Sequence, residues 1–289
     1  MTKRKVHFSS AGNTIRGILF MPDVSGEKVP AVMISHGAFE YKERYVELCE
    51  NLAMNKIASL VVDMNGHGES EGDRYHIDMR RWISDIRAGI DFLTMQTGVN
   101  PDAVAAFGLS TGGTAVIEAA LVDARIKALM LFAPTVRNIM KAGEIVLYSL
   151  LAPLGFIKKL VTGEPLKIYM PQAIGKKALA WDKKINTTII QDKRFQESYV
   201  PIPGSWQSSM VDTIKRAERI TIPTLIMQGE NDEIDSPDSS KMLYKILRCE
   251  KNIILMPETG HLGHLDGKRE KMFEYTAEWV YAVSYTHLT

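Results

Sequence analysis

Residues 103–122 read AVAAFGLSTGGTAVIEAALV, and this stretch decides the fold. The small apolar residues that end at Gly108 are typical of a strand buried on both faces, and the residues from Thr111 onward are typical of a helix. Ser110 lies at the junction, between Gly108 and Gly112. A sharp turn there would expose the serine hydroxyl beside the N–H groups of the helix. Ser110 is therefore either a catalytic nucleophile or a polar residue in a structural turn.

Strands alternate with helices on both sides of this stretch. Residues 5–10 and 14–22 are expected to form an antiparallel pair at the edge of a sheet. The other expected strands are 30–37, 57–66, 103–110, 126–134, 222–229 and 252–258, and the expected helices are 43–55, 78–96, 111–122, 237–248 and 268–283. This alternation predicts an α/β fold, with a mostly parallel sheet covered by helices on both faces and a ligand site at the carboxyl ends of its strands.

Residues 135–215 interrupt the alternation. The segment is too long for a structureless loop in a compact domain, so we predict a core formed by 1–134 and 216–289 and a cap formed by 135–215. Between residues 141 and 200 the segment carries ten lysines and arginines against five aspartates and glutamates. This charge either belongs to a solvated helical surface or attracts anionic substrates or a membrane surface.

The composition limits the class of protein. The chain has 289 residues, 45% hydrophobic and 24% charged, with a net charge of +1, so nothing indicates nucleic-acid binding. No cysteine and histidine spacing suits zinc, and we expect neither a metal nor a cofactor. Two distant cysteines, Cys49 and Cys249, suggest a reducing compartment rather than a disulfide framework. The oligomeric state stays open between a monomer and a homodimer.

No targeting or membrane segment is expected. The N-terminal MTKRKVHFSSAG has basic residues without a following apolar region, so a signal peptide is not expected. The longest apolar stretch, IVLYSLLAPLGFI at 145–157, contains a proline and is too short to span a bilayer. We therefore expect a cytoplasmic protein without an integral membrane segment.

A nucleophilic serine needs a base and an acid. His261, in MPETGHLGHLDG (256–267), follows the last expected strand and is the preferred base, whereas His264 is expected to cap or pack. The acid should come from the loop after 222–229, where Asp232 is best placed to aim back at the rim of the sheet. Glu230, Glu233, Asp235 and Asp238 are the alternatives, and Asp238 or Ser236 is expected to cap the next helix. The order serine, aspartate, histidine matches a known triad order.

The same chemistry needs donors for an oxyanion. We expect one from the backbone N–H of Thr111 and the second from the loop after residues 30–37, at Ala38 in preference to Phe39. His36 is expected to be structural. Aromatic and aliphatic side chains of 135–215 either pack the cap or line an apolar pocket, and we expect Phe39, Trp206 and Met210 to contact the substrate.

Five motifs in this order resemble those of the α/β-hydrolase superfamily: SHGAFEY (35–41), DMNGHGES (63–70), GLSTGG (108–113), QGENDEID (228–235) and ETGHLGH (258–264). Within the superfamily, DMNGHGES is similar to a structural turn of monoacylglycerol lipases, serine-peptidase-like hydrolases and cinnamoyl or feruloyl esterases, so His67 is not a second base. The resemblance implies an eight-stranded sheet, a lid at 135–215, the triad Ser110, Asp232 and His261, and oxyanion donors at Ala38 and Thr111.

The resemblance implies a serine esterase that cleaves small to medium acyl or aryl esters through an acyl-enzyme. Lipase, peptidase, thioesterase and acyltransferase activities would use the same triad, so they remain alternatives. A non-catalytic binding protein is least favoured, because such proteins usually lose a triad member and none is missing here. Two departures bear on specificity: Ala38 stands where related esterases often have a bulkier residue, and the side chain of Thr111 lies beside the expected oxyanion hole.

Overall fold

The computed structural model describes residues 1–24, 26–139, 142–204 and 210–286. Its centre is an eight-stranded sheet with the order β1-β2-β4-β3-β5-β6-β11-β12, which confirms the predicted fold class. The strands are β1 (Thr2–Ser10), β2 (Asn13–Met21), β3 (Val29–Ser35), β4 (Ala58–Val62), β5 (Val99–Leu109), β6 (Ile126–Phe132), β11 (Thr224–Gly229) and β12 (Lys251–Met256).

The sheet is antiparallel only at one edge. β1 pairs with β2, and β2 with β4, in antiparallel register, as the alternating sequence of residues 5–22 indicates. All other neighbours are parallel. β4 and β11 are buried at every position, because helices cover both faces of these inner strands. The carboxyl ends of β3, β5, β6, β11 and β12 therefore meet along one rim of the sheet.

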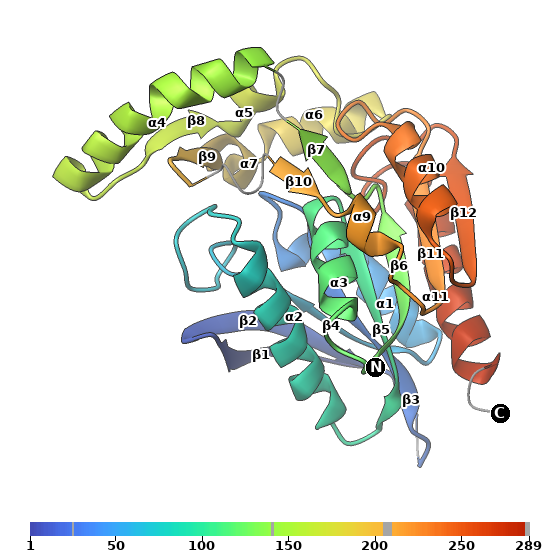
Figure 1. Cartoon of the computed structure of the whole chain (residues 1–289). Helices are drawn as coiled ribbons and strands as arrows, with labels where there is room; N and C mark the ends of the chain where they lie inside the picture. The colour runs from blue at the N-terminus through green and yellow to red at the C-terminus, as the bar shows by residue number, and fades with distance from the viewer. Residues whose placement is uncertain (25, 140–141, 205–209, 287–289) are drawn as a thin grey trace.

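Helices form a layer on each face of the sheet (Figure 1). Apolar side chains of α2, α3, α9 and α10 form one core with the sheet, and those of α1 and α11 form a second core on the opposite face. These helices are α1 (Val46–Met54), α2 (Met79–Thr94), α3 (Thr111–Ala120), α9 (Ile214–Ala217), α10 (Pro237–Ile246) and α11 (Arg269–Thr286), and the 3-10 helix η1 (Lys42–Tyr45) precedes α1. Every predicted helix outside 135–215 is present.

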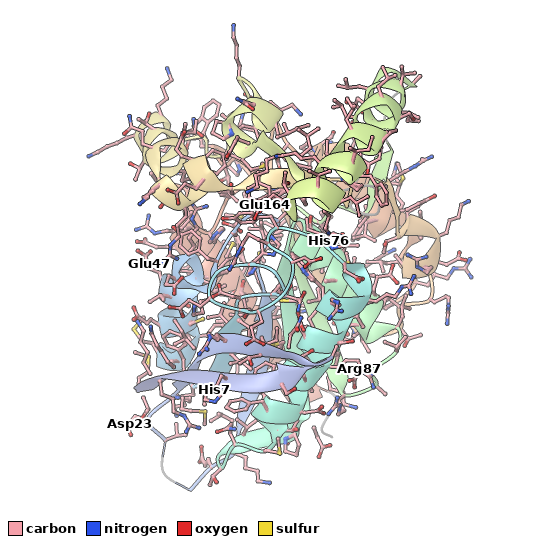
Figure 2. The ribbon with its side chains drawn as sticks, turned by 90° about the vertical axis from the view of Figure 1, so that its left-hand side faces the viewer. His7, Asp23, Glu47, His76, Arg87 and Glu164 are labelled. Carbon is pink, nitrogen blue, oxygen red and sulfur yellow. The ribbon has the colours of Figure 1, made fainter. Side chains whose placement is uncertain are left out.

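The chain between β6 and α9 forms a separate layer over the rim of the sheet (Figure 1). Its ends pair with each other through β7 and β10, and a second small sheet joins β8 to β9. A view turned by 90° shows this layer above the core, while His7 lies on the outer strands below it (Figure 2). The elements are β7 (Arg137–Ile139), α4 (Ala142–Thr162), β8 (Leu166–Tyr169), α5 (Met170–Ile174), α6 (Lys183–Gln191), α7 (Lys193–Glu197), β9 (Tyr199–Ile202) and β10 (Met210–Asp212). The domain limits given above stay a prediction.

Helix α4 corrects one expectation. It extends over 21 residues, beyond both ends of the apolar stretch 145–157, and is therefore long and apolar enough to cross a membrane by length and composition alone. The expectation that this segment is too short for a span was wrong, because the helix continues through less apolar flanking residues. Most of α4 is exposed, including Leu160 and Val161 at 77% each.

Both cysteines are free thiols. Cys49 is buried in α1, and this burial raises the pKa of its thiol to about 12. Cys249 is partly buried at the opposite face of the sheet. The fold is therefore held by its cores and its backbone pairing without a link between these two residues.

Candidate active site

Ser110 lies in a strained turn between β5 and α3. Its φ is 52° and its ψ is −121°, a conformation that residues with a side chain rarely adopt. Three backbone hydrogen bonds hold it: Ser110 N donates to Phe132 O at 3.0 Å, and Ser110 O accepts from Thr135 N at 3.1 Å and from Thr114 N at 3.2 Å. The surrounding strands thus maintain the strain and present the serine side chain to a pocket at the rim of the sheet.

The two glycines around Ser110 are required by close backbone approach. A Cβ on Gly108 would lie 2.4 Å from Gly112 O, and a Cβ on Gly112 would lie 2.4 Å from Ser35 O. Neither backbone oxygen can move without displacing β3 or α3. The Gly-x-Ser-x-Gly pattern therefore lets β5, α3 and β3 come together around the serine.

His261 and Asp232 come from the loops after β12 and β11 and are hydrogen-bonded to each other. His261 Nδ1 lies 2.8 Å from Asp232 Oδ2. The other carboxylate oxygen accepts the N–H groups of Ile234 at 2.8 Å and Asp235 at 2.9 Å, so the carboxylate is fixed. An Nδ1–H donated to Asp232 leaves Nε2 of the ring available as a base.

Charge around His261 favours its protonated form. Burial alone would lower the pKa of the imidazole, but the charge of Asp232, its hydrogen bond and the nearby charge of Asp235 raise the pKa above its ordinary value. This is the electrostatic setting of a base that must accept a proton while buried.

Ser110 and His261 line the same cavity, which has a volume of about 360 Å³. The strand-end loops and the layer above them both contribute to its mainly apolar wall. Apolar members of the wall include Phe39, Leu109, Met170, Leu179, Phe195 and Ile234. The cavity has the size and lining of a site for a small, largely apolar molecule.

Ala38 and Thr111 also line this cavity. Thr111 is the first residue of α3, where a backbone N–H has no partner within the helix. Ala38 lies in the loop after β3, next to Phe39, whose φ is 64°. The two residues that we predict as oxyanion donors are therefore on the cavity wall beside Ser110. Phe39 is on the wall too, as we expect for a substrate contact.

The other two expected substrate contacts are not described. Trp206 lies outside the described residues. Met210 begins β10, and its side chain also lies outside the described part of the chain. Their contact with a substrate stays a prediction.

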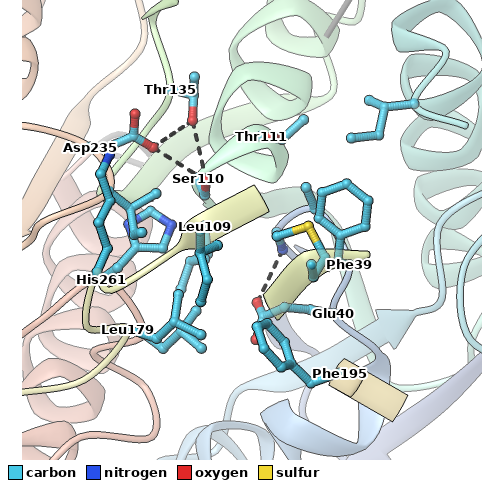
Figure 3. Close-up of a pocket in the computed structure, with 18 of the residues that line it drawn as sticks. Phe39, Glu40, Leu109, Ser110, Thr111, Thr135, Leu179, Phe195, Asp235 and His261 are labelled. Atoms are coloured by element: carbon cyan, nitrogen blue, oxygen red, sulfur yellow. Dashed lines mark hydrogen bonds between the residues drawn. The ribbon is translucent and has the colours of Figure 1, made fainter. Parts of the chain in front are cut away.

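The hydroxyl of Ser110 has partners that the sequence analysis does not anticipate. Ser110 Oγ lies 3.2 Å from Thr135 Oγ1 and donates to Asp235 Oδ2 at 3.4 Å (Figure 3). Thr135 Oγ1 donates to the same Asp235 oxygen at 2.6 Å. Among the described residues, no hydrogen bond joins Ser110 Oγ to His261. Asp235 is one of the acids considered for the triad, but no sequence signal singles out Thr135.

A buried carboxylate supports the loop that carries Ala38. Glu40 accepts a hydrogen bond from Tyr45 Oη at 2.5 Å and from Gly37 N at 3.3 Å. Burial opposes ionisation of Glu40, but His264 at 3.4 Å and Arg44 together hold its pKa below the ordinary value. His264 also stacks on Tyr45, with ring centroids 4.3 Å apart. His264 thus packs beneath the loop, as expected.

The two histidines of the other motifs are structural. His36 Nε2 accepts the Met64 N–H at 2.9 Å, and His36 Nδ1 donates to Gly37 O at 2.6 Å, so the ring links the ends of β3 and β4. His67 is fully buried, and this burial lowers its pKa to about 3. A neutral, enclosed ring away from Ser110 agrees with the interpretation that His67 is not a second base.

Comparison with known proteins identifies the class. Residues 26–268 match the family model described as "Serine aminopeptidase, S33". The match spans most of the chain. It includes strands β3 to β12 and the turn at Ser110, which are described above. The chain therefore belongs to this family of α/β-hydrolases.

Individual relatives have diverse activities. The chain is 24% identical to the polyketide transferase ATR5 of Stachybotrys chlorohalonatus, over 94% of both chains. It is also 24% identical to a thiohydrolase of Eupenicillium brefeldianum, over 92% of this chain and 89% of that one, and to a monoglyceride lipase homolog of monkeypox virus, over 86% and 88%. The structure of DcsB in complex with its substrate analogue has a TM-score of 0.86 at 19% identity, over 98% of this chain and 99% of that one. The protein is a hydrolase-family member whose reaction must be argued from its own site.

Proposed function

We propose that this protein is a serine hydrolase that cleaves carboxylic esters through an acyl-enzyme on Ser110. The observation that carries the proposal is a strained serine on the wall of the cavity that also exposes His261, whose Nδ1 lies 2.8 Å from the fixed carboxylate of Asp232. A nucleophile, a base and an orienting acid are the parts that acyl transfer needs.

The proposed reaction starts with a rotation about the Cα–Cβ bond of Ser110, which turns its hydroxyl from Asp235 toward His261. Ser110 Oγ attacks the carbonyl carbon while His261 Nε2 takes the proton, and the amides of Ala38 and Thr111 hold the oxyanion. His261 then returns the proton to the departing alkoxide, which leaves as the alcohol. Water repeats the sequence on the acyl-enzyme and releases the acid.

The cavity supports small to medium acyl or aryl esters as the substrate class. Its wall is mainly apolar, and its volume of about 360 Å³ suits a ligand of modest size. The segment above the sheet supplies Met170, Leu179 and Phe195 to this wall. The layer over the rim therefore takes part in the choice of the acyl or alcohol group.

Acyl transfer to an acceptor other than water is a second candidate. The relative that matches over 94% of this chain is called a polyketide transferase, and another is called a thiohydrolase. Both names are compatible with an acyl group on Ser110. A thioester donor and an alcohol or amine acceptor would use the same residues, and only the second nucleophile would differ.

The first experiment compares the wild type with Ser110→Ala on p-nitrophenyl esters of increasing chain length. We expect kcat/KM to fall by at least about 10³-fold, and a fluorophosphonate probe to label the wild type at Ser110. Ser84→Ala is the matched control, since Ser84 lies on α2 and its hydroxyl donates to Arg80 O in the same helix. Near-normal turnover by Ser110→Ala would overturn the proposal.

The second experiment separates hydrolysis from transfer. The wild type is incubated with one ester and increasing concentrations of a small alcohol or amine, and the free acid and the transfer product are measured. Hydrolysis predicts that the acid predominates at millimolar acceptor concentrations. Predominance of the transfer product would instead identify an acyltransferase with the same nucleophile.

A further inference from the structure

We propose that Asp235 and Thr135 form a polar subsite beside the nucleophile, which binds a hydroxyl group on the acyl chain of the substrate. This inference rests on the proposed function, because it assumes that Ser110 is acylated. It adds a substrate class, hydroxyacyl esters or thioesters, that the triad alone does not specify.

The geometry places three oxygens together. Asp235 Oδ2 accepts the Thr135 hydroxyl at 2.6 Å and the Ser110 hydroxyl at 3.4 Å, and the two hydroxyl oxygens are 3.2 Å apart (Figure 3). The backbone of Asp235 is also fixed, since its N–H donates to Asp232 Oδ1 at 2.9 Å. The carboxylate is thus held rigidly at the wall of the cavity.

Asp235 is half-buried, and its carboxylate is held by neutral groups. Among the described residues, no lysine, arginine or histidine forms an ion pair with it, and its side-chain partners are two neutral hydroxyl groups. Burial raises the pKa of this carboxyl, although the charge of His261 and the hydrogen bond from Thr135 lower it. An additional hydrogen-bond donor would compensate part of the cost of burying this charge.

Acylation removes one of these partners. When Ser110 Oγ forms the ester bond it no longer carries a hydrogen, so it can no longer donate to Asp235. The oxygen of Asp235 then has an unused acceptor position that faces the acyl group. A hydroxyl on the acyl chain can replace the lost serine hydroxyl.

The distances limit where that hydroxyl lies. Asp235 Oδ2 is 3.4 Å from Ser110 Oγ before the serine hydroxyl turns toward His261, and both residues line the same cavity. A donor oxygen at about 2.7 Å from the carboxylate therefore lies near the carbonyl end of the acyl chain. This corresponds to a hydroxyl on C2 or C3 of the acyl chain, with the remaining chain against the apolar wall at Leu179 and Ile234.

The charge of the cavity favours a hydroxyl over an ammonium group. Lys177 lines the same cavity, and its positive charge disfavours a cationic substrate. The other acid on the wall, Glu40, is already paired with Arg44 at 3.4 Å. A neutral donor satisfies Asp235 without bringing a second positive charge beside Lys177.

The test measures a ratio of specificity constants. The kcat/KM of the wild type and its variants is determined for p-nitrophenyl 3-hydroxyoctanoate, as separate enantiomers, and for p-nitrophenyl octanoate. The ratio is the kcat/KM for a hydroxy enantiomer divided by the kcat/KM for octanoate. We expect this ratio to be about 10 to 100 in the wild type for one of the two enantiomers. The ratio should fall to about 1 in Asp235→Leu and should drop clearly in Thr135→Val. The ratio cancels any general effect of a substitution on the triad.

Asp238→Asn is the matched control, since Asp238 is an exposed acid near Asp235 that pairs with Lys241. It should keep the wild-type ratio. A wild-type ratio near 1, or a preference retained in both Asp235→Leu and Thr135→Val, overturns the subsite. Preference for p-nitrophenyl 3-aminooctanoate over both other esters also overturns it, in favour of an amine site. Hydrolysis of octanoate that depends on Ser110 would leave the proposed function standing in each case, whereas no hydrolysis of any ester would remove both.

Discussion

A single carboxylate, Asp235, contacts Ser110 and also acts on the charge of His261. Its oxygen accepts from the serine hydroxyl, and its charge is one cause of the raised pKa of His261. The larger contribution comes from Asp232, which is hydrogen-bonded to the ring. Asp232 therefore orients the imidazole ring of His261, and both Asp232 and Asp235 raise its pKa.

The pH dependence of ester hydrolysis should report this effect. Acylation needs neutral His261, so we expect kcat/KM to rise with pH through a pKa above 6.5, the ordinary value for histidine. Asp235→Asn removes a negative charge and should shift this midpoint toward lower pH. The measurement is a pH–rate profile on one p-nitrophenyl ester. Asp238→Asn should leave the midpoint in place, and an equal shift in both variants would contradict the assignment.

Another acid, Asp85 on α2, is fully buried and should affect stability instead. Burial raises its pKa from 3.8 to about 6, and its Oδ2 accepts the Asn65 N–H at 2.8 Å. The folded state therefore binds the proton more tightly than the unfolded state, and stability is lost as pH rises through about 6. The loss is about 2 kcal/mol between pH 4 and pH 7.

Asp85→Asn should relieve this loss while keeping an acceptor for Asn65 N. We expect the variant to be more stable than the wild type by about 1–3 kcal/mol at pH 8, and much closer to it at pH 4. Urea unfolding at a series of pH values measures the difference. A difference that does not change with pH would show that Asp85 is not the responsible group.

At the scale of elements, α4 approaches β9 most closely at a buried glycine. Gly155 is the buried residue of this helix in the part of the chain that the structure describes, and a Cβ there would lie 2.4 Å from Ile202 O in β9. The remainder of α4 is mostly exposed. The helix therefore depends on this close approach for its position over β9.

Gly155→Ala should loosen α4 without unfolding the core. We expect faster proteolysis within residues 142–202 and an altered KM for long-chain esters, with a small change in the main unfolding transition. Gly143→Ala is the matched control, because a Cβ there meets nothing within 4 Å. Gly143→Ala should make α4 slightly more resistant to proteolysis, since alanine has a higher helix propensity than glycine. Identical proteolysis of both variants would contradict this role of Gly155.

The helices and strands also show why part of the structure could be predicted from the sequence. Residues 5–134 and 222–283 yielded their strands and helices because buried strands and amphipathic helices leave a clear periodicity. Ser110, Asp232 and His261 could be proposed as site residues because each lies shortly after an expected strand. Thr135, Glu40 and Asp266 could not, since their roles depend on contacts between segments far apart in the sequence. The length of α4 was underestimated because its ends are less apolar than its middle.

At the scale of the whole molecule, one carboxylate joins the layer over the rim of the sheet to the loop that carries His261. Asp266 is fully buried and accepts backbone N–H groups from Trp181 at 2.6 Å and Asp182 at 3.0 Å, at the start of α6. It also accepts the Gly260 N–H at 2.8 Å, directly before His261. The position of His261 is therefore coupled to that of the cap.

Asp266→Ala should lower both the stability of the fold and the activity. Removing the acceptor leaves buried N–H groups without a partner, so we expect a loss of about 2–5 kcal/mol in stability and a lower kcat. Asp182→Ala provides the comparison. The side chain of Asp182 caps α6 by accepting from Lys184 N and Ile185 N, so its loss should lower stability by about 1 kcal/mol. We expect little change in kcat. Unfolding curves and esterase kinetics on both variants check this, and an equal effect on kcat would refute the coupling.

The pairing of β7 with β10 has a consequence for how such enzymes diversify. Arg137 lies opposite Asp212 and Ile139 opposite Met210, so the intervening chain leaves and re-enters the core at one place. A segment whose two ends are adjacent can be replaced by another of different length without rethreading the sheet. Exchange of residues 140–209 between family members should therefore transfer substrate preference, while Ser110, Asp232 and His261 keep their arrangement.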